Sequence, residues 1–336
     1  MSADSLLRVR DLAVHFPAGH RNGRRLFVHA VDGVSFDVKR GTTFGIVGES
    51  GSGKSTTAQA VMRLVEITAG EIELGGVPLS KLKDEALRSE RSRFQMIFQD
   101  PFSSLDPRRR AGAAVRQTLD LLGVGDLKRR DETVAEMLTA VGLHPSAARL
   151  YPHQFSGGQR QRLCIARALA SQPELVVCDE PVSALDVAIQ AQILNLLRRL
   201  QREQFLTYLF ISHDLAVVQN ICDEVAVMYL GEFVEKAPTD AIFGGARHPY
   251  TWSLMAAALS PEPREGRRPD RFIVAGEPPS PIDPPAGCRF SGRCPFATER
   301  CHREKPALRE LAPGHQVACH YAETLDCPIP ALRQAA

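Results

Sequence analysis

The sequence Gly48-Glu49-Ser50-Gly51-Ser52-Gly53-Lys54-Ser55 is a glycine-rich stretch that ends in lysine and serine. A short apolar run, residues 42–47, precedes it, and we expect a helix over residues 55 to about 65. Strand, glycine-rich loop and helix in this order form a P-loop, in which backbone N–H groups and the positive end of the helix bind phosphate. The pattern therefore predicts an α/β domain that binds a nucleotide.

The residues of this loop have distinct predicted tasks. Its glycines allow backbone N–H groups to converge on phosphate oxygens. Lys54 supplies a positive charge for the β- and γ-phosphates, and the hydroxyl of Ser55 is a predicted ligand for Mg²⁺. The predicted nucleotide-binding residues of the loop are Gly48, Glu49, Ser50, Gly51, Ser52, Gly53, Lys54, Ser55 and Thr56.

A second strand is predicted over residues 174–179, and two acidic residues, Asp179 and Glu180, stand at its end. A carboxylate at the end of a buried apolar strand is costly unless it has a partner. Mg²⁺ is the natural partner for Asp179. Glu180 is the candidate general base for the attacking water, a role worth roughly 10²–10⁴-fold in rate. The alternative interpretation is that the two acids cap a helix.

The rest of the chain divides by its hydrophobic pattern. Apolar runs over residues 206–212 and 225–230 predict further strands of a parallel sheet covered on both faces. Residues 6–40 are β-rich, with a solvated hairpin loop expected at residues 20–25, and residues 108–165 have helical patterns, one of them ending at Gly142. From Ser260 the composition changes to Pro, Arg, Gly and Cys, and the prolines at residues 278, 279, 281, 284 and 285 mark a boundary region that cannot be regular helix.

Composition excludes several classes of protein. The 336 residues are 44% hydrophobic, enough for a large core, and the net charge is only +2, so we expect no binding to nucleic acid through a basic face. No apolar run is long enough to span a membrane. The first residues lack the features of a secretory signal, so a cytosolic location is expected.

A second candidate phosphate site lies in the sequence Phe155-Ser156-Gly157-Gly158-Gln159-Arg160-Gln161-Arg162. Ser156, Gly157 and Gly158 precede a predicted helix over residues 161–170, so they stand near a helix N-terminus, where anions bind. The chain already has one complete P-loop. A second phosphate-binding element makes sense if it serves the nucleotide of another subunit.

Together these motifs resemble those of ABC ATPases, and they occur in the order that is usual for this family. It implies a RecA-like P-loop ABC ATPase core with an antiparallel β subdomain and a helical subdomain, ATP with Mg²⁺ as ligands, and head-to-tail pairing of two subunits. The signature residues Ser156, Gly157, Gly158 and Gln159 would close on the partner's nucleotide. Phe155 replaces the usual leucine, an apolar substitution.

The resemblance also implies roles for single residues outside the loops. Gln99 matches the glutamine that senses Mg²⁺, Asp186 lies in the loop that touches the partner subunit, and His213 matches the switch histidine that contacts the γ-phosphate. Phe16, after the first predicted strand, matches the aromatic that stacks on adenine; its alternative is a core phenylalanine. Magnesium would be held by Ser55, Gln99 and Asp179.

Nearly the whole chain resembles a narrower group, the ATP-binding subunits of bacterial dipeptide and oligopeptide importers. The segments that carry this resemblance are residues 151–162, 179–187, 227–231, 248–251 and 276–281. The form of residues 179–186 is similar to the F-type ATPase of these systems. This resemblance implies that the chain forms a heterodimer with a second, D-type ATPase on two membrane permease subunits, and that it meets an external binding protein only indirectly. It also implies that the chain lies peripherally on the cytoplasmic face of the membrane.

Three alternatives remain at this level. Related importers carry nickel, glutathione or other small solutes. A soluble ABC ATPase that acts on ribosomes or DNA usually has two cassettes or a long coiled coil, and this chain has one cassette and no sustained heptads. A kinase would share the P-loop but has no use for the segment at residues 156–159.

Eight cysteines are present. Cys164, Cys178 and Cys222 sit singly in apolar segments and are expected to be buried small hydrophobes. The others lie near the C-terminus, where Cys288, Cys294, Cys301 and Cys319 are separated by five, six and seventeen residues. Four thiolates suit an iron–sulfur cluster or zinc; members of the resembling family carry such cysteines, and some bind a [4Fe–4S] cluster there. Unligated or disulfide-forming cysteines are the alternative, and Cys327 is expected to be a free thiol.

These observations predict a nucleotide-binding domain over residues 1–259, with a helical subdomain over about residues 100–170. A small region rich in proline and cysteine, of the kind found at the C-terminus of oligopeptide and dipeptide transporter ATPases, follows over residues 260–336.

Overall fold

The computed structural model describes residues 4–21, 23–258 and 276–328. The chain forms two compact units, each built from separate stretches of sequence. The first comprises Met1–Arg8, Asp37–Thr43 and Glu73–Ile211, and the second comprises Val9–Phe36, Phe44–Ile72 and Ser212–Ala336. The P-loop and the C-terminal region therefore belong to one unit. The acidic pair and the signature belong to the other. The predicted boundary at Ser260 lies outside the described residues.

Parallel strands form the centre of the first unit. β5 (Phe94–Ile97) pairs with β6 (Leu175–Asp179), and β6 pairs with β7 (Thr207–Ser212), both in parallel. Every residue of β6 and β7 is buried, as the continuous apolar runs predict. Because the carboxyl ends of parallel strands meet at one edge, Asp179 lies at the end of β6, opposite Ile211.

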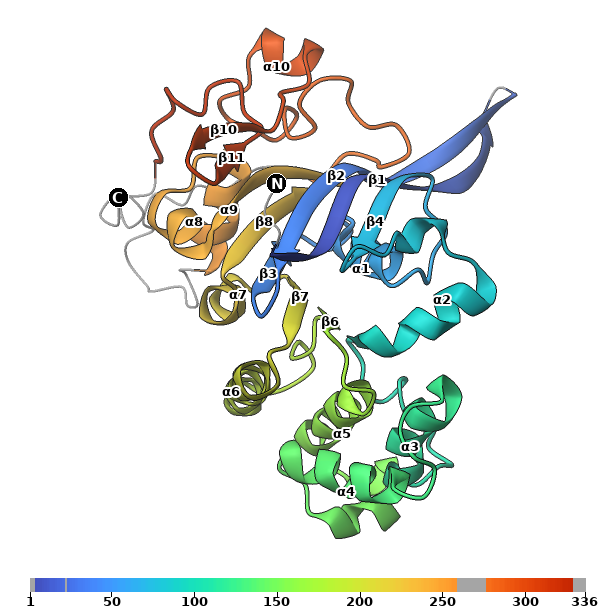
Figure 1. The fold of residues 1–336 in the computed structure, drawn as a ribbon. Coiled ribbons are helices and arrows are strands. Elements are labelled where there is room, and N and C mark those ends of the chain that lie inside the picture. The colour runs from blue at the N-terminus through green and yellow to red at the C-terminus, as the bar shows by residue number, and fades with distance from the viewer. Residues whose placement is uncertain (1–3, 22, 259–275, 329–336) are drawn as a thin grey trace. The chain divides into compact units, whose positions relative to one another are not determined.

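Helices make up most of the remainder of the first unit. α3 (Ala111–Leu122), α4 (Arg130–Ala140) and α5 (Gly157–Leu169) lie together in Figure 1 and form the predicted helical subdomain. The helix α4 ends before Gly142, whose φ of +77° confirms its place as a stop signal. The unit also contains α2 (Asp84–Glu90), α6 (Val187–Gln204) and short 3-10 helices at Leu79–Lys81, Arg91–Arg93, Pro145–Arg149 and Pro152–Gln154.

The second unit contains the strand that leads into the P-loop. This strand, β3 (Thr43–Val47), pairs in parallel with β8 (Glu224–Tyr229), and β9 (Glu232–Pro238) pairs with β8 in the antiparallel sense. α1 (Lys54–Val61) follows the loop and is shorter than predicted, because Arg63 adopts a φ of +50° that a helix cannot contain. α7 (Leu215–Ile221), α8 (Thr239–Gly245) and α9 (Pro249–Ala258) complete this part of the chain.

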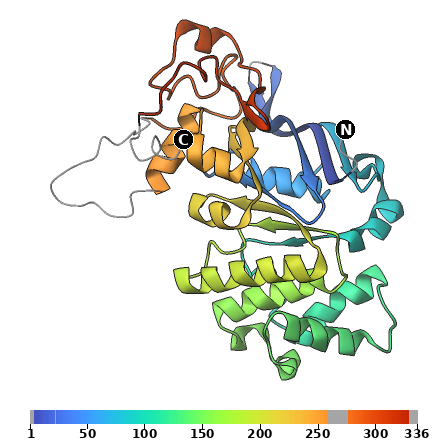
Figure 2. The ribbon, with the colours of Figure 1, turned by 60° about the vertical axis from the view of Figure 1, so that its left-hand side comes forward.

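The C-terminal region adds strands to this sheet, which the sequence pattern does not reveal. β11 (His315–Val317) pairs antiparallel with β9, and β10 (Arg309–Ala312) pairs antiparallel with β11. The short helix α10 (Glu299–Arg303) precedes them. Both views show this red segment beside α8 and α9 (Figure 1, Figure 2). The cysteine-containing region is thus packed on the β8–β9 hairpin.

Three strands form a separate sheet in the order β2-β1-β4, with bounds Ser5–Arg21 for β1, Arg24–Lys39 for β2 and Ala69–Leu74 for β4. The β-rich prediction for residues 6–40 is confirmed. The predicted loop at residues 20–25 is wrong in extent, because β1 continues to Arg21 and β2 begins at Arg24. Hydrogen bonding between long strands outweighs the polar composition of the tip.

None of the helices that the structure describes is both long and apolar enough to cross a lipid bilayer. Cys164, Cys178 and Cys222 are buried, as predicted, and burial raises the pKa of the Cys164 and Cys178 thiols above its usual range.

Candidate functional site

The P-loop connects β3 to α1 by a path that only glycine permits at two positions. At Gly53, φ is +106° and a Cβ atom would lie 2.1 Å from the carbonyl oxygen of Ala30. A Cβ atom on Gly48 would lie 2.2 Å from the carbonyl oxygen of Met228. Neither distance is possible for a real side chain, so the loop is wedged between the backbone of β2 and that of β8.

Lys54 is the first residue of α1, and its side chain folds back over the loop. Its Nζ donates to the carbonyl oxygens of Gly48 at 2.8 Å and Glu49 at 2.7 Å. The side chain is buried, and these two carbonyl oxygens supply the hydrogen-bond partners that a buried ammonium group needs. Ser55 and Thr56 lie in the first turn of α1. An ammonium group and a helix N-terminus beside a glycine loop are the components of a phosphate site.

Two further predicted residues lie in the same unit as the loop. Phe16 lies within β1 rather than after it, because the strand is longer than predicted, and 38% of the residue is exposed. The aromatic ring is therefore not part of the core. His213 directly follows β7 and is exposed, and Asp214 caps the next helix, α7, by accepting from the N–H groups of Ala216 and Val217.

A polar cluster of His15, His29 and Asp32 stands next to Phe16. Their ligand-type atoms lie within 4.8 Å of one another, but Asp32 already bonds the guanidinium of Arg289 and the imidazole of His15. Burial alone would raise the pKa of Asp32, and the nearby charges of Arg289 and His15 outweigh it and lower the pKa below its usual value. The cluster anchors Arg289 of the C-terminal region to β2.

The acidic pair of the first unit is placed with a specific geometry. Asp179 ends β6 and is only 6% exposed. Glu180 follows with a φ of +47°, a left-handed conformation that non-glycine residues rarely adopt. Gln99 Nε2 donates to Glu180 Oε2 at 2.9 Å, so the structure brings these two predicted residues together. The pair does not cap a helix, since α6 begins several residues later.

The signature is the start of helix α5. Ser156 is its N-cap: its Oγ accepts from the N–H of Gln159, and Gln159 Oε1 accepts from the N–H of Ser156. This is a capping box, which places the helix start at Gly157 instead of Gln161 as predicted. Ser156 is exposed and Phe155 is buried, which leaves the helix end accessible while the apolar residue anchors it.

The glycines of the signature pack against the segment that contains Asp186. A Cβ atom on Gly158 would lie 2.6 Å from Cγ2 of Ile189, and one on Gly157 would lie 3.5 Å from Leu185. Asp186 itself is the N-cap of α6, with its side chain accepting from the N–H of Ile189 at 2.9 Å. The signature and the Asp186 segment thus form one packed surface in this unit.

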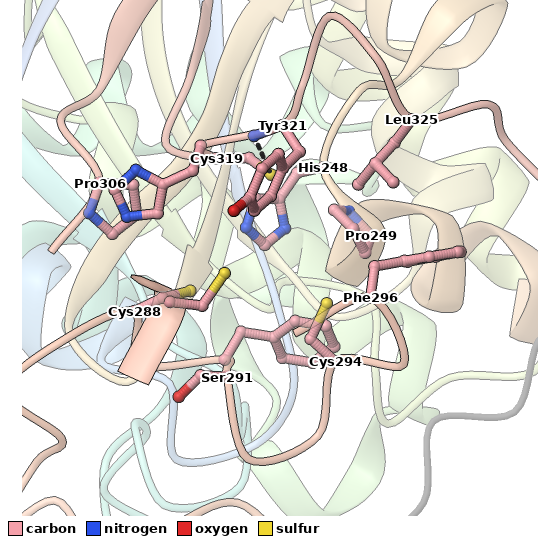
Figure 3. A pocket seen from close by; sticks show the side chains of 13 residues that line it. His248, Pro249, Cys288, Ser291, Cys294, Phe296, Pro306, Cys319, Tyr321 and Leu325 are labelled. Carbon is pink, nitrogen blue, oxygen red and sulfur yellow. Dashed lines mark hydrogen bonds between the residues drawn. The ribbon is translucent and has the colours of Figure 1, made fainter. Parts of the chain in front are cut away.

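The C-terminal cysteines converge on an enclosed pocket. Cys288, Cys294, Cys301 and Cys319 all line it, together with His248 and Phe290 among others. Figure 3 shows the sulfur atoms of Cys288, Cys294 and Cys319 around this space. Burial, together with the neighbouring thiols, raises the pKa of Cys288 to about 12 and that of Cys294 to about 11.

The donor set of this pocket fits a metal group bound by four thiolates. The N–H of Tyr321 donates to Cys319 Sγ at 3.4 Å, the kind of bond that stabilises a ligating sulfur. Cys327 does not line the pocket. His302 does not line it either, and His320 lines it but directs Nε2 to the carbonyl oxygen of Glu304.

Comparison with known proteins agrees with this geometry. Residues 31–183 match the family model described as ABC transporter, and residues 234–301 match the one described as oligopeptide/dipeptide transporter, C-terminal region. Two solved structures are similar: the ATP-binding cassette MJ0796, a dimer in a post-hydrolysis state bound to ADP and Pi (28% identity, TM-score 0.62, 70% of this chain and 99% of that chain), and CbiO1 of Clostridium perfringens (25%, 0.63, 72% and 92%). The fold and the P-loop therefore define an ABC transporter ATPase.

The curated relatives narrow this class. The oligopeptide transport ATP-binding protein AppF of Bacillus subtilis is 48% identical over 320 residues, which cover 94% of this chain and 97% of that protein. A putative peptide import ATP-binding protein of Brucella ovis is 48% identical over 319 residues, covering 95% and 98%. The chain belongs to the family of ATP-binding proteins of oligopeptide and dipeptide ABC transporters.

Proposed function

We propose that this chain is the ATP-hydrolysing subunit that powers an ABC importer of oligopeptides or dipeptides. The observation that carries the proposal is that one chain holds two elements suited to phosphate, the P-loop and the exposed N-terminus of α5 at Ser156. One nucleotide needs only one P-loop, so the second element serves the nucleotide of a partner subunit. The relatives whose names specify peptide import support the cargo class.

In this proposal the residues of the ATP site divide into three tasks. Phe16 stacks on adenine, and residues 48–56 bind the phosphates. Ser55, Gln99 and Asp179 hold Mg²⁺, which neutralises phosphate charge when bound. Glu180 accepts a proton from the attacking water, and His213 contacts the γ-phosphate. The bond between Gln99 and Glu180 supports this assignment, because it orients the proposed base.

The work is done by closure of a dimer. Ser156 and the surface around Asp186 contact the partner ATPase, which in this family is a second, different subunit. Val187, next to Asp186, is 82% exposed, an apolar side chain suited to an interface. ATP stabilises the closed dimer by binding both halves, and hydrolysis releases it. The solved dimer of MJ0796 with ADP and Pi supports this arrangement.

In this proposal the chain lies peripherally on the cytoplasmic face of the membrane, where it contacts two membrane permease subunits. The external binding protein is reached only through these permeases. Phe98 and Phe102, which are 39% and 62% exposed, flank Gln99 and offer an aromatic surface to a permease. Arg160 stacks on Phe102, and Arg108 lies exposed nearby in sequence. Contact at Phe98 and Phe102 would reach Gln99 directly.

The four pocket cysteines hold a [4Fe–4S] cluster in this proposal, with zinc as the alternative occupant. Four thiols around one enclosed pocket support either group. The cluster supplies a rigid cross-link among segments that are far apart in sequence. The division at residues 259 and 260 into a nucleotide-binding domain and a cysteine-containing region is part of the same proposal.

The test is co-expression with two candidate permease subunits and a candidate partner ATPase from the same source, followed by reconstitution in vesicles. ATP-dependent uptake of labelled dipeptides and oligopeptides is expected, and Lys54→Ala should abolish it. Arms with nickel and with glutathione distinguish the alternative cargoes. ATP hydrolysis by the isolated subunits with no transport of any cargo would favour a soluble ABC ATPase.

A further inference from the structure

We propose that Arg293, in the C-terminal region, is a positioning residue for the P-loop and couples the cysteine pocket to nucleotide affinity. The inference rests on the proposed function in one respect: the P-loop is taken to bind ATP. It adds a control element outside the loop, 244 residues away in sequence from its contact, Glu49. All the residues concerned lie in the second unit.

The contact is a two-point ion pair. Arg293 Nη1 donates to Glu49 Oε2 at 2.9 Å, and Nη2 donates to Oε1 at 3.1 Å. The guanidinium also stands over the rings of Tyr229 and Phe290, and its side chain is only 10% exposed. Paired hydrogen bonds between planar charged groups fix geometry as well as distance. The carboxylate of Glu49 is therefore held in one place by the C-terminal region.

The main chain of Glu49 is held as well, and this carries the effect into the loop. Its N–H donates to the hydroxyl of Tyr250 at 2.8 Å. Its carbonyl oxygen accepts from Lys54 Nζ at 2.7 Å. A shift of Glu49 therefore moves an acceptor of the lysine that is predicted to bind phosphate. Arg293 acts on Lys54 through one intervening residue.

The main chain of Arg293 belongs to a tight turn between two of the pocket cysteines, Cys288 and Cys294. The N–H of Ser291 donates to the carbonyl of Cys288, and the N–H groups of Arg293 and Cys294 both donate to the carbonyl of Phe290. Cys288 and Cys294 both line the pocket. Cys288, Cys294 and Arg293 therefore share one turn, through which a change of coordination or oxidation at these sulfurs would act on Arg293 in this proposal.

The same turn is fastened at a second point. Arg289 bonds the carbonyl oxygen of Leu230 and the carboxylates of Asp32 and Glu232. Before this turn in the chain, the carbonyl oxygen of Pro281 accepts from the N–H of His29 at 2.9 Å. Two arginines that lie between Cys288 and Cys294 thus bind neighbouring segments: Arg293 binds Glu49 of the P-loop, and Arg289 binds Asp32 of β2. The turn is therefore attached to both segments.

A purely structural ion pair would behave differently from a positioning one. Removing it would lower the melting temperature, but the folded protein would bind ATP as before. Removing a positioning residue weakens ATP binding in protein that is still folded. It also breaks the reciprocal effect, by which nucleotide changes the accessibility of the cysteines.

The experiment compares full-length Arg293→Met, which keeps an apolar stem without charge, with Arg293→Lys, which keeps the charge without the two-point geometry. Arg300→Met is the matched control, because Arg300 pairs with Glu304 on the exposed surface of the same region. The readouts are Kd for Mg-ATP by calorimetry, and KM and kcat for hydrolysis. Circular dichroism at the assay temperature shows that each variant is folded.

We expect Arg293→Met to raise Kd and KM about tenfold, which corresponds to about 1.4 kcal/mol, with little change in kcat. Arg293→Lys should recover part of the affinity, and Arg300→Met should match the parent chain. In a Glu49→Gln background, Arg293→Met should add little, because the two residues act as a pair. Unchanged Kd in folded Arg293→Met would overturn the inference. Absence of ATP binding by the parent chain would instead overturn the proposed function.

A second readout does not depend on affinity. Mass spectrometry follows alkylation of Cys288 and Cys294 in the full-length protein with and without Mg-ATP. Nucleotide should slow the reaction in the parent chain and in Arg300→Met, and this protection should be lost in Arg293→Met. Equal protection in all three proteins would contradict the coupling.

Discussion

Gln99 donates its side-chain amide to the carboxylate of Glu180, with 2.9 Å between Nε2 and Oε2. Glu180 also has a φ of +47°, and hydrogen bonds support this conformation on both sides: its N–H donates to Ile211, and its carbonyl accepts from Ser183. Unfavourable backbone conformations of this kind persist where neighbouring structure holds them, and they cluster at active sites. The direction of the Glu180 carboxylate is thus fixed by the backbone and by Gln99 together.

Glu180→Gln should therefore separate ATP binding from hydrolysis. The amide is nearly the same size and keeps the backbone, but it cannot accept a proton from water. We expect hydrolysis to fall roughly 10²–10⁴-fold while ATP binding persists. Phosphate release measures the first effect, and ATP-dependent association in size-exclusion chromatography measures the second.

Glu203→Gln is a suitable control for this variant, because Glu203 lies on the exposed surface of α6 and pairs only with a surface arginine, Arg199, among the interactions described for it. Hydrolysis by Glu203→Gln should equal that of the parent chain. If Glu180→Gln also hydrolysed ATP at the parent rate, Glu180 would not be the base.

The packing of the signature glycine against α6 gives a second prediction. A Cβ atom on Gly158 would lie 2.6 Å from Cγ2 of Ile189, a branched side chain that cannot rotate out of the way easily. Gly158→Ala should therefore destabilise the protein by about 1–3 kcal/mol through overpacking. Thermal unfolding would measure the loss.

The double variant Gly158→Ala with Ile189→Ala supplies the internal check. Removing Cγ2 of Ile189 removes the clash, so the double variant should lose less stability than the sum of the two single variants. Simple additivity would mean that contact with Ile189 is not the cause.

Much of this arrangement is predictable from local sequence. Two strands, β6 and β7, are predictable from their continuous apolar runs, and the end of α4 is predictable from Gly142. These signals are predictable because they depend only on residues close by in the sequence. The start of α5 was predictable too: Ser156 and Gln159 have the spacing of a capping box, and that signal places the helix start correctly. The end of α1 and the length of β1 were missed because hydrogen bonds and backbone angles at those positions outweigh local propensity.

The contacts that join the C-terminal region to the P-loop could not be read from one sequence. β11 pairs with β9, and Arg293 pairs with Glu49, across long stretches of chain that include a change in composition. Hydrophobic periodicity carries no information about which distant partner a charged residue selects. The clustering of cysteines near the C-terminus made four of them candidate ligands of one metal group. It did not predict that the turn between Cys288 and Cys294 carries arginines that bind β2 and the P-loop.

A buried carboxylate gives the third prediction. Glu235 of β9 is fully buried and accepts from the N–H groups of Arg247 and His248 and from His315 Nε2, the last at 2.8 Å. His315→Leu removes one hydrogen-bond partner from the buried carboxyl group of Glu235 and should destabilise the protein by roughly 1–3 kcal/mol. Chemical denaturation should show this loss, whereas His153→Leu at an exposed position should have little effect. Equal stability of the two variants would show that His315 does not stabilise the Glu235 site.

The pocket cysteines give the last prediction. Protein prepared without oxygen and supplied with iron and sulfide should contain both elements and absorb broadly in the visible range, since thiolate-bound clusters do so. Cys301→Ser should abolish this loading, because the residue lines the pocket and is only 7% exposed. Cys327→Ser should load normally, because Cys327 lies outside the pocket lining. Zinc bound at one ion per chain, with no sulfide, would reject the cluster in favour of a zinc site. Equal loading of Cys301→Ser and the parent chain would show that the pocket is not the binding site.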